Sequence, residues 1–158
     1  MQPPARPPIG LHLARTARLV SRAFDDALAA AGGSVPVWLV LISLKSQRLL
    51  GSQRKLAEAI GIEGATLTHH LNAMEANGLV TRRRDPTNRR VHVVELTDAG
   101  EALFQRLRAA AVAFDRQLRA GLADEDVATL ARLLDRLRDN VAGQDARPVR
   151  TRGNPAGR

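Results

Sequence analysis

Arginine side chains gather between residues 82 and 90, where RRRDPTNRR sets five arginines against one aspartate around a Pro-Thr-Asn turn. Guanidinium groups at this density are not buried without partners, because removing charges from water is costly. They suit the phosphate backbone of DNA, with one arginine reaching into the minor groove. A solvated, turn-forming hairpin is the simpler alternative for such a segment taken alone.

Hydrogen-bonding side chains also lie at helical spacing just before this basic segment. Leu67, Leu71 and Met74 follow an i, i+4, i+7 pattern and form the apolar face of a predicted helix. Side chains on its opposite arc can meet base edges or phosphates, best near the helix start, and a small apolar one can touch a thymine methyl. The candidate reading residues are Ala65, Thr66, Thr68, His69 and Asn72.

Two short helices and a hairpin must position these groups. Ser52 is a predicted cap for a helix at 53–60 that ends at Gly61, and Asn77-Gly78 ends the next helix. Helix, glycine turn and helix form a helix-turn-helix, so we interpret the basic hairpin after it as a wing. Leu79-Val80 opens its first strand, and residues 91–96 form the second. The predicted DNA-backbone contacts are Gln53, Arg54, Lys55, Arg82 and Arg84, and the predicted wing contacts are Asn88, Arg89 and Arg90.

Longer amphipathic helices flank this module. Apolar residues from Ile9 to Leu28 step at helical spacing, and Ser34 is placed to cap the helix that carries Trp38. Thr97 is a predicted cap for a further long helix, and Asp124 for the last one. In that last helix the apolar residues show the 3-4 spacing of an a/d seam: Val127, Leu130, Leu134, Leu137 and Val141.

These long apolar faces exceed what a small module can cover, so we expect the first, fifth and sixth helices to pack on a second subunit. A dimer also places two reading helices about 34–36 Å apart, one turn of a near-palindromic duplex. The predicted fold is mainly α with a small β-hairpin wing. Residues 34–96 form the winged helix-turn-helix lobe and residues 9–33 and 97–142 the helical dimerisation region. Residues 1–8 and 143–158 are expected to be disordered, the latter as a basic tail.

Composition supports an anionic partner and argues against other classes. The formal net charge of this 158-residue chain is +8. Without Cys there is no disulfide, thiolate metal site or cysteine nucleophile, and HHLNAME lacks the H-E-x-x-H spacing of a zinc hydrolase. We therefore expect no enzyme activity and no cofactor. No apolar run long enough to span a membrane and no signal peptide is seen, so a cytoplasmic location is expected.

An effector pocket is a further hypothesis. The arginine stripe on the first helix is either a solvated face or the lining of a pocket for a small anionic effector, an aromatic compound or a carboxylate. Trp38 is either core or a ligand-facing edge, and His70 either a partly buried histidine or a ligand sensor. Zinc regulation through histidines and carboxylates stays open as an alternative, as does nonspecific architectural DNA binding. The candidate pocket residues are His12, Arg15, Arg18, Trp38 and His70.

The sequence resembles the MarR family of winged helix-turn-helix transcription regulators, from about Ile9 to Val141. The resemblance is carried by LAEAIGI, by NGLVTR after the reading helix, by the DPTNRR wing tip and by VELTDAGEAL. It implies a dimeric repressor, usually acting near its own promoter and released by a small ligand.

The resemblance also implies roles for residues at the wing tip. Similar proteins carry an Asp-x-Arg element there, and the matching positions are Asn88 and Arg90. The arginine is kept, whereas the bracing aspartate is replaced, and Asp85 is the candidate to brace the arginine instead. Similar proteins often have arginine at the position of His69, so weaker binding or a different base preference is expected.

Overall fold

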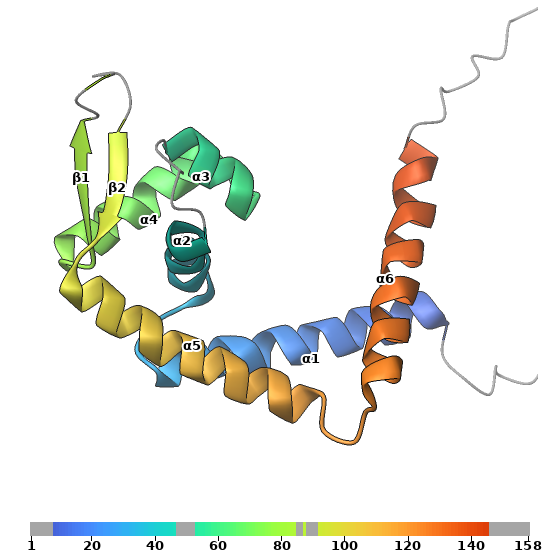
Figure 1. The fold of residues 1–158 in the computed structure, drawn as a ribbon. Helices are drawn as coiled ribbons and strands as arrows, with labels where there is room; N and C mark the ends of the chain where they lie inside the picture. Colours follow the sequence, from blue (N-terminus) through green and yellow to red (C-terminus); the bar gives the residue numbers. More distant parts are fainter. Residues whose placement is uncertain (1–7, 47–52, 85–86, 88–91, 146–158) are drawn as a thin grey trace, which may run out of the picture. The chain divides into compact units, whose positions relative to one another are not determined.

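The computed structural model describes residues 8–46, 53–84, 87 and 92–145 of the chain. These residues form mostly helices and one hairpin, as Figure 1 shows, and the predicted fold class is confirmed. In chain order the elements are α1 (Ile9–Ala30), α2 (Val35–Ser46), α3 (Gln53–Ile60), α4 (Gly64–Ala76), β1 (Val80–Arg84), β2 (His92–Leu96), α5 (Asp98–Leu118) and α6 (Asp124–Asp145).

The chain divides into two compact units, Met1–Gln117 and Leu118–Arg158. The first unit holds the helix-turn-helix and hairpin together with α1 and nearly all of α5, and the second holds α6. This grouping reflects contacts within one chain. The expected division by role, into a DNA-binding lobe and a dimerisation region, stays a prediction.

Helix α2 is the centre of the first unit. Apart from Lys45 and Ser46, every residue of α2 is buried or half-buried, as expected for a helix that is apolar around its whole circumference. It contacts α1, α3, α4 and β2. Val40 and Leu41 are fully buried in a core that includes Leu28 of α1 and Leu107 of α5. Packing on α2 therefore fixes where α3 and α4 lie.

In the described part of the chain, no single helix is both long and apolar enough to cross a bilayer. Helices α1 and α2 meet that criterion only when taken together, as a pair bent by 76°.

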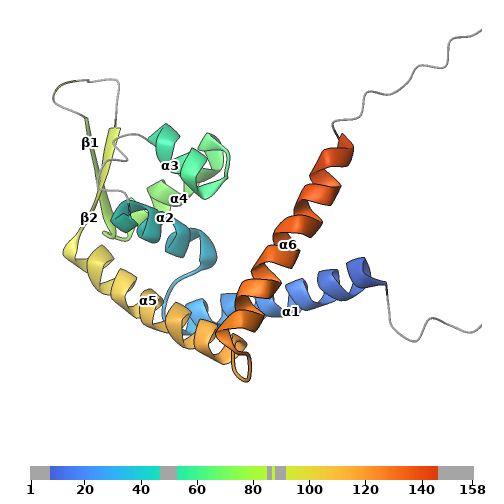
Figure 2. The ribbon, with the colours of Figure 1, turned by 45° about the vertical axis from the view of Figure 1, so that its right-hand side comes forward.

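The hairpin is joined to α4 and α5 at its base. Strands β1 and β2 are antiparallel, with Val80 opposite Leu96, and the hairpin stands beside α4 in Figures 1 and 2. The Thr97 N–H donates to the Leu79 carbonyl at 3.1 Å. The Thr97 hydroxyl oxygen accepts from the Gly100 N–H at 3.0 Å, which confirms the predicted cap of α5. The same hydroxyl donates to the Gly78 carbonyl, so one threonine ties the end of α4 to the start of α5.

Two predicted helix ends of the helix-turn-helix are confirmed. Gly61 after α3 has φ +76° and Gly78 after α4 has φ +67°. Residues that carry a Cβ atom rarely adopt such positive φ values, so glycine suits both helix ends. Helix α4 starts at Gly64, with Glu63 as an N-cap in extended conformation whose carboxylate makes no capping bond. The Ser52 cap and Val91 lie outside the described residues.

The predicted bounds of α6 need two corrections. Asp124 is the first helical residue rather than the cap, because the carbonyl that accepts from the Val127 N–H belongs to Ala123. The Asp126 carboxylate reaches back and accepts from the Ala123 N–H at 3.0 Å, as the fourth residue of a capping box does. The helix also continues to Asp145, past Gly143, where a disordered tail was expected.

Large apolar side chains stay exposed along the long helices. Ile9 and Leu19 of α1 are exposed over 67% and 68% of their surface, and Val141 of α6 over 69%. Leu130 and Leu134 of the predicted a/d seam are also exposed. Exposed apolar side chains one turn apart along a single helix, as Leu130 and Leu134 are, are typical of an interaction surface.

Candidate nucleic-acid interface

Helix α4 presents a polar face opposite its buried one. Leu67, Leu71 and Met74 are buried, which confirms the predicted apolar face. The five predicted reading residues all lie on α4 and are exposed: Ala65, Thr66, Thr68, His69 and Asn72. The helix is therefore oriented by its apolar contacts, and its polar arc is exposed to solvent.

Thr68 has its hydroxyl proton engaged inside the helix. Its Oγ1 donates to the Gly64 carbonyl at 2.9 Å, the back-bond typical of threonine in a helix. The outward side of Thr68 then offers oxygen lone pairs and a methyl group. In this rotamer Thr68 can accept a hydrogen bond from a base or contact a thymine methyl. To donate to a phosphate, its hydroxyl would first have to break the hydrogen bond to the Gly64 carbonyl.

The two neighbouring histidines of α4 differ in exposure. His69 is exposed and His70 is half-buried, and their ring centroids lie 5.8 Å apart in an edge-to-face arrangement. Among the described residues, no group of three or more His, Cys, Asp or Glu side chains is placed to hold a metal ion.

Helix α3 carries the predicted phosphate contacts at its start. Arg54 is exposed and donates to the Glu58 carboxylate one turn along, at 3.1 Å. Lys55 is exposed as well, and Gln53 begins the helix, although its side chain lies outside the described part. A surface ion pair such as Arg54–Glu58 contributes little to stability, so it is readily exchanged for a phosphate.

The arginines of β1 have different environments. Arg82 is half-buried and donates to two residues of α4: to the Glu75 carboxylate at 2.9 Å through Nε and to Asn72 Oδ1 at 2.7 Å. Arg83 forms a two-point pair with Glu95 of β2. Arg84 is exposed. The predicted backbone contact at Arg82 is thus already engaged within the protein.

Both carboxylates paired with β1 arginines are held in their charged form. Hydrogen bonds from Arg82 lower the pKa of Glu75 below its usual 4.5, and those from Arg83 do the same to the pKa of Glu95. Glu75 was not among the predicted functional residues. Glu75 lies one turn after Asn72 on α4, and the strand that carries Arg82 starts four residues after the helix ends. That proximity in sequence is the signal that could have identified it.

Four residues predicted to act at the wing tip belong to the part of the chain that the structure does not describe. Asn88, Arg89, Arg90 and the proposed brace Asp85 lie outside the described residues, so their predicted roles stay predictions.

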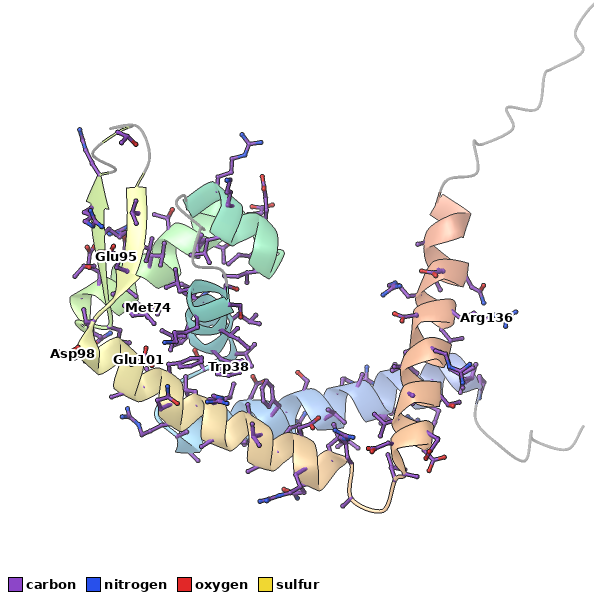
Figure 3. All side chains as sticks on the ribbon, viewed as in Figure 1. Trp38, Met74, Glu95, Asp98, Glu101 and Arg136 are labelled. Carbon is purple, nitrogen blue, oxygen red and sulfur yellow. The ribbon has the colours of Figure 1, made fainter. Side chains whose placement is uncertain are left out.

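A groove in the first unit is a candidate effector site. Its volume is about 450 Å³ and it lies between α2 and α5. Trp38 and Phe104 stack along it, with ring centroids 5.8 Å apart and an interplanar angle of 12°; Figure 3 labels Trp38 beside α5. The full lining is Trp38, Ile42, Phe104, Arg108, Ala111, Val112 and Asp115.

Only one of the five predicted pocket residues lines this groove. His12, Arg15 and Arg18 are exposed on α1, and His70 belongs to α4. The sequence interpretation missed Phe104 and Arg108. These two residues are one turn apart on α5, and that spacing of an aromatic and a cationic group is the signal that was available.

The comparisons with known proteins agree with this architecture. Residues 34–92 match the model of the MarR family. The HTH-type transcriptional regulator YdgJ of Bacillus subtilis is 32% identical over 95 residues, 60% of this chain, and the match spans only 58% of that relative's length.

Solved structures of similar proteins extend the likeness over most of the chain. The transcriptional regulator PA3341 is 31% identical, with a TM-score of 0.70 over 86% of this chain and 99% of its own. The transcriptional repressor CouR, bound to a 23-mer DNA duplex, is 27% identical, with a TM-score of 0.73 over 83% of this chain and 92% of its own. CouR from Rhodococcus jostii RHA1 bound to p-coumaroyl-CoA is also similar, at 26% identity and a TM-score of 0.68 over 84% and 90% of the two chains. Helix-turn-helix, wing and flanking helices thus recur together, and this chain belongs to the MarR family of transcription regulators.

Proposed function

We propose that this regulator binds duplex DNA sequence-specifically, with α4 in the major groove and the β1–β2 hairpin over the adjacent backbone. The observation that carries the proposal is the exposed polar arc of α4, opposite Leu67, Leu71 and Met74. An α-helix fits the major groove, where each base pair presents a distinct pattern of donors and acceptors. That the similar repressor CouR has been solved on a DNA duplex supports this role.

The exposed apolar surface supports a homodimer. Ile9 and Leu19 of α1 and the Leu130–Leu134 seam of α6 lack cover in the single chain. A second copy would bury them and present a second α4 to the next major groove of a near-palindromic operator. Each protomer then contacts one half-site.

Repression released by a small ligand is the proposed mode of control. The groove between α2 and α5 combines the Trp38–Phe104 stack with one cationic and one acidic side chain, Arg108 and Asp115. This lining suits a flat aromatic compound whose carboxylate pairs with Arg108. The similar protein CouR binds p-coumaroyl-CoA. Binding that favours a different spacing of the two α4 copies needs a coupling of only about 1–3 kcal/mol to release DNA.

Binding-site selection on random duplex DNA tests the proposal, followed by footprinting and sedimentation at the binding concentration. A dimer that protects a near-palindrome supports it. A monomer, or uniform coating of DNA without sequence preference, contradicts it and favours an architectural protein.

A compound screen on the selected site tests the control step. Release by an aromatic carboxylate should weaken in Arg108→Gln, whereas Arg15→Ala tests the sequence-based candidate, which lies outside the groove. If release is unchanged in Arg108→Gln and lost in Arg15→Ala, the effector binds elsewhere. Adding zinc or EDTA to the same assay tests the metal-responsive alternative.

A further inference from the structure

Three side chains from α4 and β1 form one hydrogen-bonded cluster beside the proposed reading surface. The Arg82 guanidinium donates to Asn72 Oδ1 at 2.7 Å and, through Nε, to the Glu75 carboxylate at 2.9 Å. The Arg82 backbone N–H also donates to Glu75, at 3.3 Å. A strand residue is thereby attached to two residues one turn apart on the reading helix.

The chemistry of this cluster fixes which way the Asn72 amide faces. A guanidinium carries only donors, so the atom that faces Arg82 must be the amide oxygen. The Nδ2 group then points away from Arg82, and it has no hydrogen-bond partner among the described residues. Asn72 is exposed on the same arc as Thr68 and His69. Its two N–H donors are therefore available to DNA.

Arg82 itself is held in place from two sides. Its backbone is fixed by strand pairing opposite Val94, which is buried. Its side chain is exposed over only 21% of its surface and is attached to an ionised carboxylate. Because the guanidinium is already fixed, Arg82 loses little further side-chain entropy when Asn72 binds DNA. A residue that orients a base-contacting side chain must be rigid in this way.

We propose that Arg82 and Glu75 are positioning residues that orient Asn72 to donate from Nδ2 to an acceptor on a base edge. This inference rests on the proposed function and assigns specificity within it. Guanine and adenine present N7 and thymine presents O4 in the major groove, whereas cytosine presents the N4 donor. Asn72 therefore disfavours cytosine at the base it meets. Arg82 acts through Asn72 rather than on a phosphate.

Base-preference profiles measured on the selected operator test this role. Competition titrations with all four base pairs at each position give the profile, and the wild-type chain should disfavour cytosine about tenfold at one position per half-site. Asn72→Asp replaces the donor by an acceptor oxygen, so cytosine should become the preferred base there, with weaker binding overall. Arg82→Lys keeps the charge but loses the planar fork, so the cytosine penalty should shrink to about twofold.

A matched variant controls for the loss of an arginine from the same strand. Arg83→Lys changes a neighbour that is also paired with a glutamate, Glu95, but does not touch α4 through that pair. Its profile should equal that of the wild type. In an Asn72→Ala background, Arg82→Lys should cause no further change of profile, because the two residues act as one unit.

The outcomes separate the inference from the proposed function. Wild-type protein without preference for any duplex contradicts the proposed function itself. A selective wild type whose profile is unchanged in Asn72→Asp, or an Arg82→Lys variant that weakens all sequences equally, overturns the role proposed here and leaves the regulator intact. Asn72 is exposed, so an unchanged profile in Asn72→Asp overturns the inference even if Arg82→Lys fails to fold.

Discussion

Replacing Gly100 with alanine should disrupt the junction between α4, the hairpin and α5. Gly100 is buried in the first turn of α5, and a Cβ there would lie 2.0 Å from the Leu79 carbonyl oxygen and 3.3 Å from Leu96 Cδ2. Real Cβ atoms essentially never approach an atom within 3.0 Å. The obstacle is backbone rather than a flexible side chain, so either α5 or the base of β1 must move.

The cost follows from two effects at this junction. Inserting a methyl group into a packed site costs about 1–3 kcal/mol. Moving the Leu79 carbonyl also weakens its hydrogen bond from the Thr97 N–H, now 3.1 Å, which contributes about 0.5–1.5 kcal/mol. We expect a loss of about 2–4 kcal/mol in the free energy of unfolding. For a chain of this size that lowers Tm by roughly 5–15 °C.

Chemical and thermal unfolding followed by circular dichroism measure this loss. Protein concentration must be fixed, because the proposed dimerisation would make Tm concentration-dependent. Gly64→Ala is the matched control: Gly64 is also in the first turn of a helix, but its Cβ would meet nothing within 4 Å. That variant should be unchanged or more stable by up to about 1 kcal/mol. If Gly100→Ala unfolds like Gly64→Ala, the described packing of α5 on Leu79 is wrong.

Three further predictions concern acid stability, salt dependence and assembly. Because hydrogen bonds from arginine lower the folded-state pKa of Glu75 and Glu95, stability should be constant above about pH 5. It should fall as the pH drops below 4.5 through the lowered values. Melts from pH 7 to pH 3 measure this, and Glu95→Gln should flatten the decline. Arg54→Ala should weaken binding to all sequences alike and reduce the salt slope by about 0.9, as titrations at several salt concentrations show, whereas a changed base preference would argue against a phosphate contact. Leu134→Glu places a charge in the exposed α6 seam and should yield monomers by sedimentation. Arg136→Glu changes a residue of the same helix, labelled in Figure 3, that is not part of the 3-4 spacing of the seam, and it should remain dimeric.

Local features of the sequence predict the helix-turn-helix well. The apolar positions of α4 repeat with the helical period, and Gly61 and Gly78 mark ends where the backbone must adopt positive φ. Both signals act within a few residues, so they do not depend on the rest of the fold. The threonine cap of α5 is predictable for the same reason.

The ends of α6 show where local reasoning fails. Asp124, Glu125 and Asp126 all suit the start of a helix. The sequence alone does not show which of the three carboxylates accepts a hydrogen bond from a backbone N–H at the helix start. Gly143 costs a helix only about 1 kcal/mol, so the helix can pass through it.

Contacts between elements are harder to predict than the elements themselves. Trp38 and Phe104 come from α2 and α5, and their stacking depends on how both helices pack on the core. Strand alternation could have placed Arg82 on the same face of β1 as buried Val80, and hence toward α4. The sequence interpretation instead treated all hairpin arginines alike, as side chains that contact DNA.

The alternation of β1 divides its arginines into different roles. Arg82 faces α4 and pairs with Glu75, while Arg83 faces the other way and pairs with Glu95; Arg84, at the strand end, is exposed. Arg82 is half-buried and would have to give up Glu75 and Asn72 before it could replace a counterion on DNA, and that exchange of one anion for another gains little. A count of cationic side chains therefore overestimates the phosphate contacts of this hairpin. The salt dependence of binding should reflect Arg84 and the start of α3, where the Arg54–Glu58 pair is exposed, more than it reflects Arg82. The formal charge of +8 measures the attraction of the chain to DNA rather than the number of its contacts.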